Sequence, residues 1–496
     1  MNFVAAIQTV FQPFTLFVIG ASAIFGLFVG SMPGLTATMA AALLVPLTFY
    51  MDPVPAIGAI VTCSAMSIFA GDIPGALLRI PGTPASAAYV SEAYLLGRRG
   101  ELSRVLSVNL LASAFGGIFG TMALILLAPQ LAQIALRFSS YEYFWLALIG
   151  LSAATLISAS NPFKGITSLF LGLFLATVGL DVVTGMPRYT FGTVDLMGGV
   201  SLIAALIGLF AIAELFRKAS TIHEDLPPPE QVKGAILLQG ASSIMFYKWN
   251  ALRGGVIGTI LGILPGAGAD IAGWISYAVS KRFSKTPEKF GTGHIEGVVD
   301  ASASNNASLG GAYVPALVFG IPGDSITAIV IGVLLIKGMN PGPTVFTQSG
   351  DIVSAIFVVF ILANLLLIPL GLLAIKAARH VLRINQRILL PIILMFSIVG
   401  AFAVNNAVFD LWIILALGVV GWFMEENGFP IAPMVLGLVL GKIVEESFTN
   451  SMIKAGGDLV AFVDRPIAGG LAFVFFAIWI VPALMRLRRA WSTRAS

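Results

Sequence analysis

Residues 30–39 read GSMPGLTATM and residues 262–271 read GILPGAGADI, and each stretch interrupts a long apolar segment with a Pro-Gly pair. Proline removes a backbone donor and glycine frees the backbone dihedrals, so each pair is expected to end one helix and let another begin. Two further apolar segments carry Pro-Gly breaks, at residues 80–84 (IPGTP) and 321–325 (IPGDS). The sequence therefore predicts four helices that stop and restart in mid-course.

The composition places these segments in a membrane. Only 10% of the 496 residues are charged, whereas an ordinary soluble domain has about 25%. The apolar fraction is 57% and the mean hydropathy is +0.95, values that exclude a soluble globule and also intrinsic disorder. The small net charge of +4 is dispersed and gives no reason to expect a nucleic-acid partner. The chain is predicted to be an all-α polytopic protein of the lipid bilayer, with its single cysteine, Cys63, buried as a small hydrophobe.

Candidate membrane spans recur along the chain as apolar stretches of about 17–25 residues. The unbroken ones lie near residues 105–128, 141–160, 165–180, 195–214, 351–375, 388–404, 408–424, 430–447 and 466–485. The broken ones occupy roughly residues 14–49, 55–97, 249–282 and 298–337. Together they predict about 11–12 spanning segments. The sequence leaves open whether segments 14–49 and 249–282 re-enter the membrane or cross it.

The breaks recur in register, which predicts an internal duplication. The matched pairs are Gly30–Gly262, Pro33–Pro265 and Gly34–Gly266 with an offset of 232 residues, and Pro74–Pro315, Pro81–Pro322 and Gly82–Gly323 with an offset of 241. The longer offset corresponds to an insertion at the basic stretch 281–289. The expected organisation is a first transmembrane repeat at 1–216, a cytoplasmic linker at 217–248, a second repeat at 249–447, and a C-terminal helix with a basic tail at 448–496.

The basic clusters predict that the two repeats have opposite orientations. Cytoplasmic loops carry an excess of Lys and Arg, which assigns to the cytoplasm the clusters at 98–104, 217–253, 281–289, 376–387 and 486–494. The loop after the first broken hairpin then lies outside, and its counterpart at 281–289 lies inside. Each repeat is expected to hold a Pro-Gly re-entrant hairpin and a broken helix, and the C-terminus is expected to be cytoplasmic. Inverted repeats with broken helices are typical of secondary transporters.

Polar residues at the breaks are candidates for binding a solute. Half-helix N-termini offer free N–H groups to an anion, and small hydroxyl side chains suit the same task. The hydroxyl candidates are Thr36, Thr38, Thr83, Ser86 and Ser325, with the amides Asn305 and Asn306 upstream of the fourth break. The alternative is that the Pro-Gly pairs only kink helices and that the Asn residues only pack them.

Ionisable residues inside apolar segments are expensive and are usually functional. Arg79, just before the second break, is the candidate cation for an anionic substrate, and Asp72, Asp270 and Asp324 are candidates for coupling to a cation or proton. The alternative for the first two is an internal Asp72–Arg79 ion pair that serves assembly only. The histidines at 223, 294 and 380 are too scattered for a metal site, and no Walker A motif is present, so we expect neither metal, cofactor nor enzymatic activity.

Five stretches resemble the large membrane subunit of the tripartite tricarboxylate transporters (TctA-like). They are GSMPGLTATMAAALLVPLTF from Gly30, RIPGTPASAA from Arg79, GILPGAGADIAGWISYAVSKRFSKTPEKFGTGHIEGVV from Gly262, NNASLGGAYVPALVFGIPGDSITA from Asn305, and FPIAPMVLGLVLGKIVEESF from Phe429. The resemblance implies a bacterial inner-membrane permease that works with a small four-helix membrane subunit and a periplasmic solute-binding protein delivering a carboxylate substrate. A Na⁺ or H⁺ gradient would drive it.

Carried over to this sequence, the family's two glycine-rich motifs fall on Gly30–Thr38 with Pro81–Ser86, and on Gly262–Asp270 with Asn305–Ser325. They add to the substrate-binding candidates Pro33, Gly34, Pro81, Gly82, Pro265, Gly266, Gly268, Pro322 and Gly323. Asp300-Ala301-Ser302 departs from the Ala-Pro-Glu common in the family, and Asp72 and Arg79 stand where small or neutral polar residues are common. The sequence therefore predicts a secondary importer of di- or tricarboxylates without naming the substrate, the ion or the oligomeric state. The alternative is a passive anion channel or a structural membrane scaffold.

Overall fold

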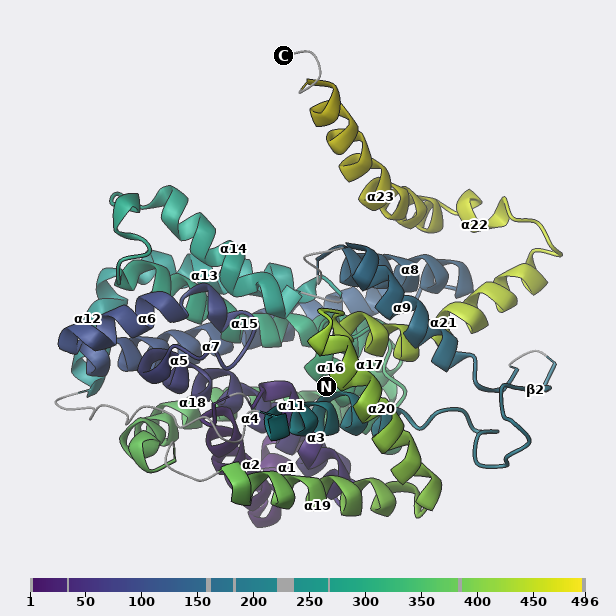
Figure 1. The fold of residues 1–496 in the computed structure, drawn as a ribbon. Coiled ribbons are helices and arrows are strands. Elements are labelled where there is room, and N and C mark those ends of the chain that lie inside the picture. Colours follow the sequence, from purple (N-terminus) through teal and green to yellow (C-terminus); the bar gives the residue numbers. More distant parts are fainter. Residues whose placement is uncertain are drawn as a thin grey trace. The chain divides into compact units, whose positions relative to one another are not determined.

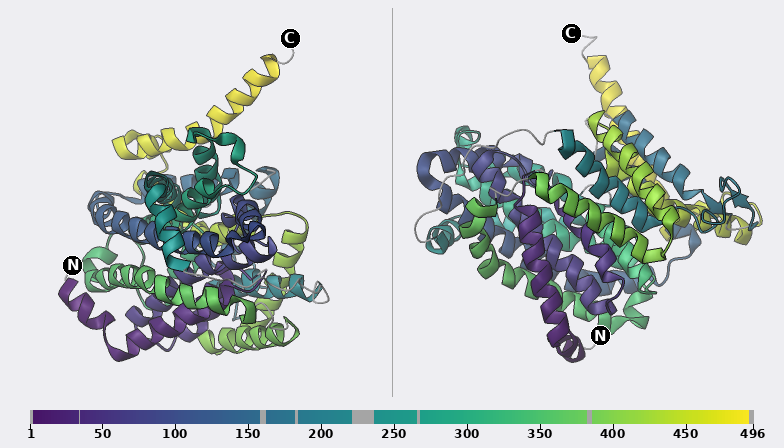
Figure 2. Two further views of the ribbon diagram at one scale, coloured as in Figure 1. Left: turned by 90° about the vertical axis from the view of Figure 1, so that its left-hand side faces the viewer. Right: turned by 60° about the horizontal axis from the view of Figure 1, so that its bottom comes forward.

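The computed structural model describes residues 3–33, 35–157, 162–181, 184–220, 236–265, 268–381 and 386–492, and nearly all of them are helical (Figure 1 and Figure 2). The described part of the chain divides into two compact units, residues 1–133 with 201–428 and residues 134–200 with 429–496. This division differs from the predicted repeat boundaries, which stay a prediction. The expected all-α fold is confirmed.

The larger unit contains both predicted pairs of broken segments. Its helices before the polar interval are α1 (Phe3–Val10), α2 (Pro13–Gly30), α3 (Ala37–Thr48), α4 (Pro53–Ala70), α5 (Asp72–Leu78), η1 (Ser86–Ala88), α6 (Val90–Leu96), η2 (Gly97–Glu101), most of α7 (Leu102–Ala135), α10 (Leu202–Leu206), η3 (Ile207–Ile212) and α11 (Ala213–Ser220). Those after it are α12 (Ile236–Phe246), α13 (Lys248–Ile263), α14 (Gly268–Phe283), η4 (Pro287–Lys289), α15 (Ile295–Phe319), α16 (Ser325–Ile336), α17 (Val345–Gln348), α18 (Gly350–Val381), α19 (Gln386–Asn405) and α20 (Val408–Glu426).

The smaller unit packs α21 (Ile431–Lys454) against α8 (Ser140–Ile157) and α9 (Pro162–Ala176), with α23 (Pro466–Ser492) on α8. The short helix α22 (Ala461–Asp464) leads into α23, and the Trp145 indole donates to the Phe462 carbonyl at 2.8 Å. Two short antiparallel strands, β1 (Gly179–Leu180) and β2 (Pro187–Arg188), are the exception to the helical fold. Arg188 ties them to α21 through a bidentate bond to Glu445.

The chain is a multi-pass membrane protein. Five described helical stretches are long and apolar enough to cross a bilayer: Pro13–Gly30, Pro53–Leu78, Val90–Ala135, Gly350–Ala378 and Val408–Glu426. By contrast, α3 and α16 have 12 residues each, so each rises only about 18 Å, well short of a hydrocarbon core of about 30 Å. The helix expected at 195–214 begins later, at Leu202, because residues 195–200 form turns and Gly199 has a φ of 86°. The expected linker is partly helical, since α11 reaches Ser220 and α12 starts at Ile236.

All four breaks occur where the sequence predicts them. Chain segments without helix separate α2 from α3, α5 from η1, α13 from α14, and α15 from α16. Gly320 ends α15 in the left-handed conformation with a φ of 68°, and Arg79 ends α5 in the same way with a φ of 62°. A left-handed conformation costs a residue with a side chain about 1 kcal/mol. Arg79 thus has a local structural role as a helix C-cap.

Glycines let the helices of each broken pair approach closely. A Cβ added to Gly26 or Gly30 on α2 would lie 2.5 Å or 2.6 Å from a carbonyl oxygen of α4, that of Cys63 or Ser67. On α13 a Cβ added to Gly258 or Gly262 would lie 2.2 Å from a carbonyl oxygen of α15, that of Ser304 or Ser308. These contacts are related by the offsets 232 and 241, as is the approach of Gly82 to Gly71 and of Gly323 to Ala312. The packing has the spacing that the predicted duplication requires.

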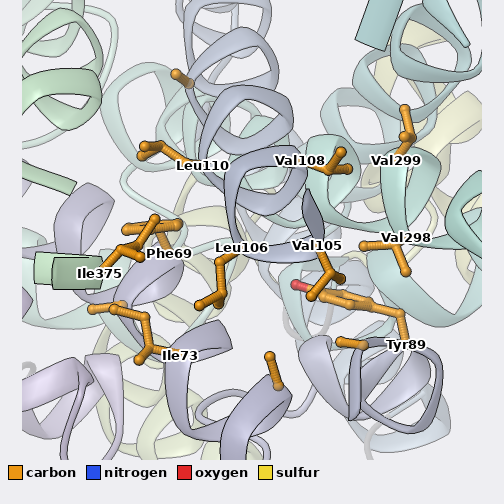
Figure 3. Close-up of a cluster of buried hydrophobic side chains, with 14 of the residues drawn as sticks. Phe69, Ile73, Tyr89, Val105, Leu106, Val108, Leu110, Val298, Val299 and Ile375 are labelled. Carbon is orange, nitrogen blue, oxygen red and sulfur yellow. The ribbon is translucent and has the colours of Figure 1, made fainter. Parts of the chain in front are cut away.

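An apolar cluster of α5, α6, α7, α15 and α18 surrounds the second break (Figure 3). Figure 3 shows the Tyr89 ring within this cluster, together with Val105, Leu106 and Val298. Tyr89 is 1% exposed, although it carries a hydroxyl group that must find a partner. Cys63 is free and fully buried, as expected.

A buried carboxylate joins α6 to the loop before α15. Glu92 is 1% exposed and accepts hydrogen bonds from the Tyr277 hydroxyl at 2.6 Å and from the backbone N–H groups of Gly291, Gly293 and His294. Four donors compensate the burial of this charge. Glu92 therefore fixes the segment 291–294, which belongs to the predicted second repeat, to the first.

We predict that Gly258→Ala destabilises the protein, because the new methyl group would force α13 and α15 apart. Overpacking of this kind costs about 1–3 kcal/mol. Gly20→Ala on α2 is the matched control, since a Cβ there meets no atom within 4 Å. Thermal unfolding of the two detergent-solubilised variants should show a lower midpoint for Gly258→Ala only. Equal midpoints would contradict the close packing of α13 on α15.

We also predict that Glu92→Gln lowers the free energy of unfolding by about 2–3 kcal/mol, because a neutral amide cannot accept from all four donors. Glu446→Gln is the control, since the Glu446 side chain is 40% exposed and lies 3.9 Å from Lys442. Denaturation followed by tryptophan fluorescence measures both changes. The clamp would lose its support if the two variants unfolded alike.

Candidate functional site

A small cavity lies in the larger unit where the four breaks meet. Residues 36–38 of the first break, 82–85 of the second, 269–270 of the third and 324–326 of the fourth line it. Ile68 and Asn305 complete the wall. The volume open to water is about 40 Å³, enough for a few water molecules at about 10–15 Å³ each. It is far below the roughly 300 Å³ of a small-molecule pocket, so the cavity has a closed form in this structure.

Three helix N-termini open into this cavity. The first turns of α3, α14 and α16 contribute Ala37 and Thr38, Ala269 and Asp270, and Ser325 and Ile326. The N-terminal N–H groups of a helix lack intrahelical partners and carry roughly half a positive charge. Three such ends at one cavity provide a site suited to anions without a basic side chain. Indeed, none of the described residues lining the cavity is Lys, Arg or His.

The helix starts are fixed by their own side chains. Thr36 caps α3 by accepting from the Met39 N–H at 3.2 Å. Asp324 and Thr327 form a capping box on α16, in which each side chain accepts from the other's backbone N–H at 2.7 and 2.9 Å. Thr83 and Ser86 make the same reciprocal bonds at 3.0 and 3.1 Å, with the offset of 241 residues. Caps satisfy only part of the N-terminal donors, so the rest remain available to a ligand or water.

The two halves of the cavity differ in charge. Asp270 is offset by 232 residues from Thr38, and Asp324 by 241 residues from Thr83, and all four residues line the cavity. Oxygen-rich walls with two carboxylates suit a hard cation or a proton, as oxygen ligands do in proteins. The arrangement can therefore hold an anion at the helix N-termini and a positive charge beside the two aspartates.

The structure brings together about half of the predicted site residues. Those that line the cavity are Thr36, Thr38, Gly82, Thr83, Asn305, Ser325, Asp270 and Asp324. Those that stand outside its lining are Pro33, Arg79, Pro81, Ser86, Pro265, Gly268, Asn306, Pro322, Gly323 and Asp72. Gly34 and Gly266 lie outside the described residues. Ser86 acts through its cap on Thr83, and Asn306 donates to the Ser113 carbonyl of α7 at 3.1 Å.

Asp72 and Arg79 do not pair with each other. Arg79 is exposed and its guanidinium donates to the Ser91 hydroxyl at 3.3 Å. Asp72 is 2% exposed and accepts from the Tyr89 hydroxyl at 2.7 Å. The alternative of an internal Asp72–Arg79 ion pair is therefore wrong, and Arg79 lies away from the cavity.

Tyr89 and Glu92 are buried polar residues near the cavity that sequence reasoning missed. Tyr89 accepts from the Asn305 amide at 3.3 Å, and the same amide donates to the Thr83 hydroxyl at 3.3 Å. A signal was present, because both residues follow the second break within an otherwise apolar segment. That signal was ambiguous, since Tyr and Glu are also common at membrane interfaces and in loops.

Comparison with known proteins gives the same family as the sequence motifs. Residues 16–436 match the family model described as Tripartite tricarboxylate transporter TctA family. An Agrobacterium vitis protein described as "Uncharacterized 52.8 kDa protein in TAR-I ttuC' 3'region" is 32% identical over 488 residues, covering 98% of this chain and 97% of that protein. A second one, in the TAR-II ttuC' 3'region of the same organism, is 36% identical over 234 residues, or 47% of this chain and 97% of its own length. No solved structure matches the chain.

We predict that a cysteine in the cavity reacts with a small polar thiol reagent. Thr38→Cys in full-length protein should be labelled by a methanethiosulfonate reagent, because its side chain lies at a water-accessible wall. The natural Cys63 is fully buried and provides the unreactive background. Mass spectrometry of labelled protein separates the two sites. Labelling of Cys63 but not of Thr38→Cys would contradict the position of the cavity.

Proposed function

Because this chain belongs to the TctA family and so forms the membrane-embedded transporter component of a tripartite system, we propose that it imports organic carboxylates by secondary active transport. The substrates are di- or tricarboxylates, and the coupling ion is Na⁺ or H⁺. The proposal places the protein in a bacterial inner membrane, with a cytoplasmic C-terminus. A small four-helix membrane subunit and a periplasmic solute-binding protein are its proposed partners.

One observation carries this proposal: four helix breaks meet at one cavity, and three helix N-termini open into it. Non-helical backbone at membrane depth is tolerated only where it is buried in protein or lines a cavity. Secondary transporters place substrate sites between broken helices, with half-helix N-termini facing anionic groups. In this proposal the carboxylates of the substrate bind at the starts of α3, α14 and α16.

Two carboxylates at the same cavity give a reason for coupling to a cation. Asp270 and Asp324 would repel a polycarboxylate unless a positive charge binds with it. Cation binding beside these aspartates therefore favours substrate binding, and substrate binding favours the cation by the same factor. This reciprocity makes import against a gradient possible.

Alternating access is proposed to follow from the two repeats. The helix pairs α2–α4 and α13–α15 approach through glycines at equivalent positions, which supports two similar bodies. If the repeats are inverted, as the basic clusters indicate, rocking of one against the other opens the cavity to alternate sides. The closed cavity of about 40 Å³ fits an occluded stage of such a cycle.

We predict that uptake is driven by an ion gradient and requires Asp270. The chain is co-expressed with the small subunit and binding protein encoded beside it, and uptake of radiolabelled citrate and succinate into right-side-out vesicles is measured under imposed Na⁺ or pH gradients. Accumulation above equilibrium is expected, and an ionophore should abolish it. Asp270→Asn should reduce accumulation about tenfold or more, because a contact to a charged group contributes about 1.5–3 kcal/mol.

Asp195→Asn is the matched control, since Asp195 is exposed in the smaller unit. Membrane insertion of both variants is checked by immunoblot. Uptake that only equilibrates and ignores every gradient would favour the channel alternative. Absence of any uptake or exchange in the wild type, with correct insertion, would favour a scaffold.

A further inference from the structure

Asp72 is a buried carboxyl group that the cavity itself does not use. It begins α5, is 2% exposed, and accepts one hydrogen bond, from the Tyr89 hydroxyl to Oδ1 at 2.7 Å. Its Oδ2 atom is buried and has no hydrogen-bond partner among the described residues. An isolated carboxylate in such a place is costly, whereas the neutral acid is not.

The surroundings of Asp72 lack a compensating positive charge. From α7 the neutral Asn109 faces the same small void, and its Nδ2 atom also has no partner among the described residues. Tyr89 is the titratable side chain bonded to Asp72. The charged side chains of α6, α7 and α15 bond to other groups: Glu92 to Tyr277, Arg104 to Glu101, Glu296 to Ser284, and Asp300 to Arg253.

The void beside Asp72 also excludes a bound metal cation. It is lined by Asp72, Gly75, Ser86, Tyr89, Val90, Ala93 and Asn109, and it has no room for a water molecule. A hydrated or oxygen-coordinated cation needs several ligands and at least that much space. A proton needs neither, because it adds to Oδ2 without displacing an atom.

Hydrogen bonds connect Asp72 to the cavity. The Tyr89 hydroxyl donates to Asp72 and accepts from Asn305 Nδ2, which also donates to the Thr83 hydroxyl. Asn305 and Thr83 both line the cavity, one on α15 and the other at the second break. A change at Asp72 can thus reach the wall of the cavity through two side chains.

We propose that Asp72 is a proton-binding site of the transport cycle, linked to the substrate cavity through Tyr89 and Asn305. The inference rests on the proposed function and deepens it by naming one coupling ion and its acceptor. The carboxylate of Asp72 takes a proton from water when the second break opens, giving the neutral acid, and releases it to water on the other side. No other bond forms or breaks.

The link transmits position rather than protons, since an amide is a poor proton carrier. A deprotonated Asp72 attracts the Tyr89 hydroxyl more strongly, because charge-assisted hydrogen bonds are shorter and stronger. Tyr89 then draws on Asn305 and, through it, on Thr83. Protonation of Asp72 relaxes this chain and leaves Asn305 free to serve the cavity.

The test compares Asp72→Asn with wild type in vesicles that contain the full chain and its partner subunits. Two assays use radiolabelled citrate and succinate: exchange at equal pH, which needs no net proton movement, and accumulation driven by a pH gradient. Asp72→Asn should keep exchange and lose the accumulation driven by the pH gradient. Asp52→Asn, an exposed aspartate just before α4, should keep both.

Accumulation by Asp72→Asn equal to that of wild type would overturn the inference while leaving the proposed function intact. Absence of exchange in the wild type itself would refute the proposed function instead.

A second variant and a spectroscopic measurement cover the case in which Asp72→Asn does not fold. Tyr89→Phe removes the donor to Asp72 but keeps the ring, and it should move the pH dependence of uptake toward higher pH, because the carboxyl group then holds its proton more tightly. Infrared difference spectra of wild type at high and low pH should show the band of a protonated carboxylic acid, altered in Tyr89→Phe. An unchanged pH profile and an unchanged band in Tyr89→Phe would refute the site.

Discussion

The structure depends on how it satisfies backbone polar groups where four helices are interrupted inside a membrane. Each break exposes N–H and C=O groups that lipid cannot solvate. Side chains at the breaks satisfy some of them, as Thr36 does for α3 and Asp324 for α16. The remaining N–H groups open together into one cavity, so the feature that would destabilise an isolated helix becomes a binding surface in the assembled protein.

Close helix packing is what brings the breaks to one place. Where Gly26 and Gly30 face Cys63 and Ser67, the absence of a side chain lets α2 approach the backbone of α4. The same approach of α13 to α15 uses glycines at equivalent positions. Small residues at such contacts are typical of membrane helices, where association depends on van der Waals packing rather than on hydrophobic exclusion.

The sequence predicted the breaks well and the partners of buried polar groups poorly. Pro-Gly acts locally, so the ends of α2, α5, α13 and α15 follow from neighbouring residues. The position of Arg79 could not be predicted, because its left-handed backbone turns the side chain away from the cavity that its sequence neighbours reach. The bond from Tyr89 to Asp72 joins residues 17 positions apart, across a break whose direction no local pattern determines.

The charge difference between the halves of the cavity gives the duplication a function. A symmetric pair of repeats would place identical groups on both sides and could not distinguish an anion from its counter-ion. Threonine at 38 and 83 and aspartate at 270 and 324 break that symmetry while keeping the caps and helix starts in register. Hydroxyls beside helix N-termini favour the carboxylate, and the aspartates favour the cation. Substitution at two positions is thus enough to turn a repeated anion site into a site for an anion together with a cation.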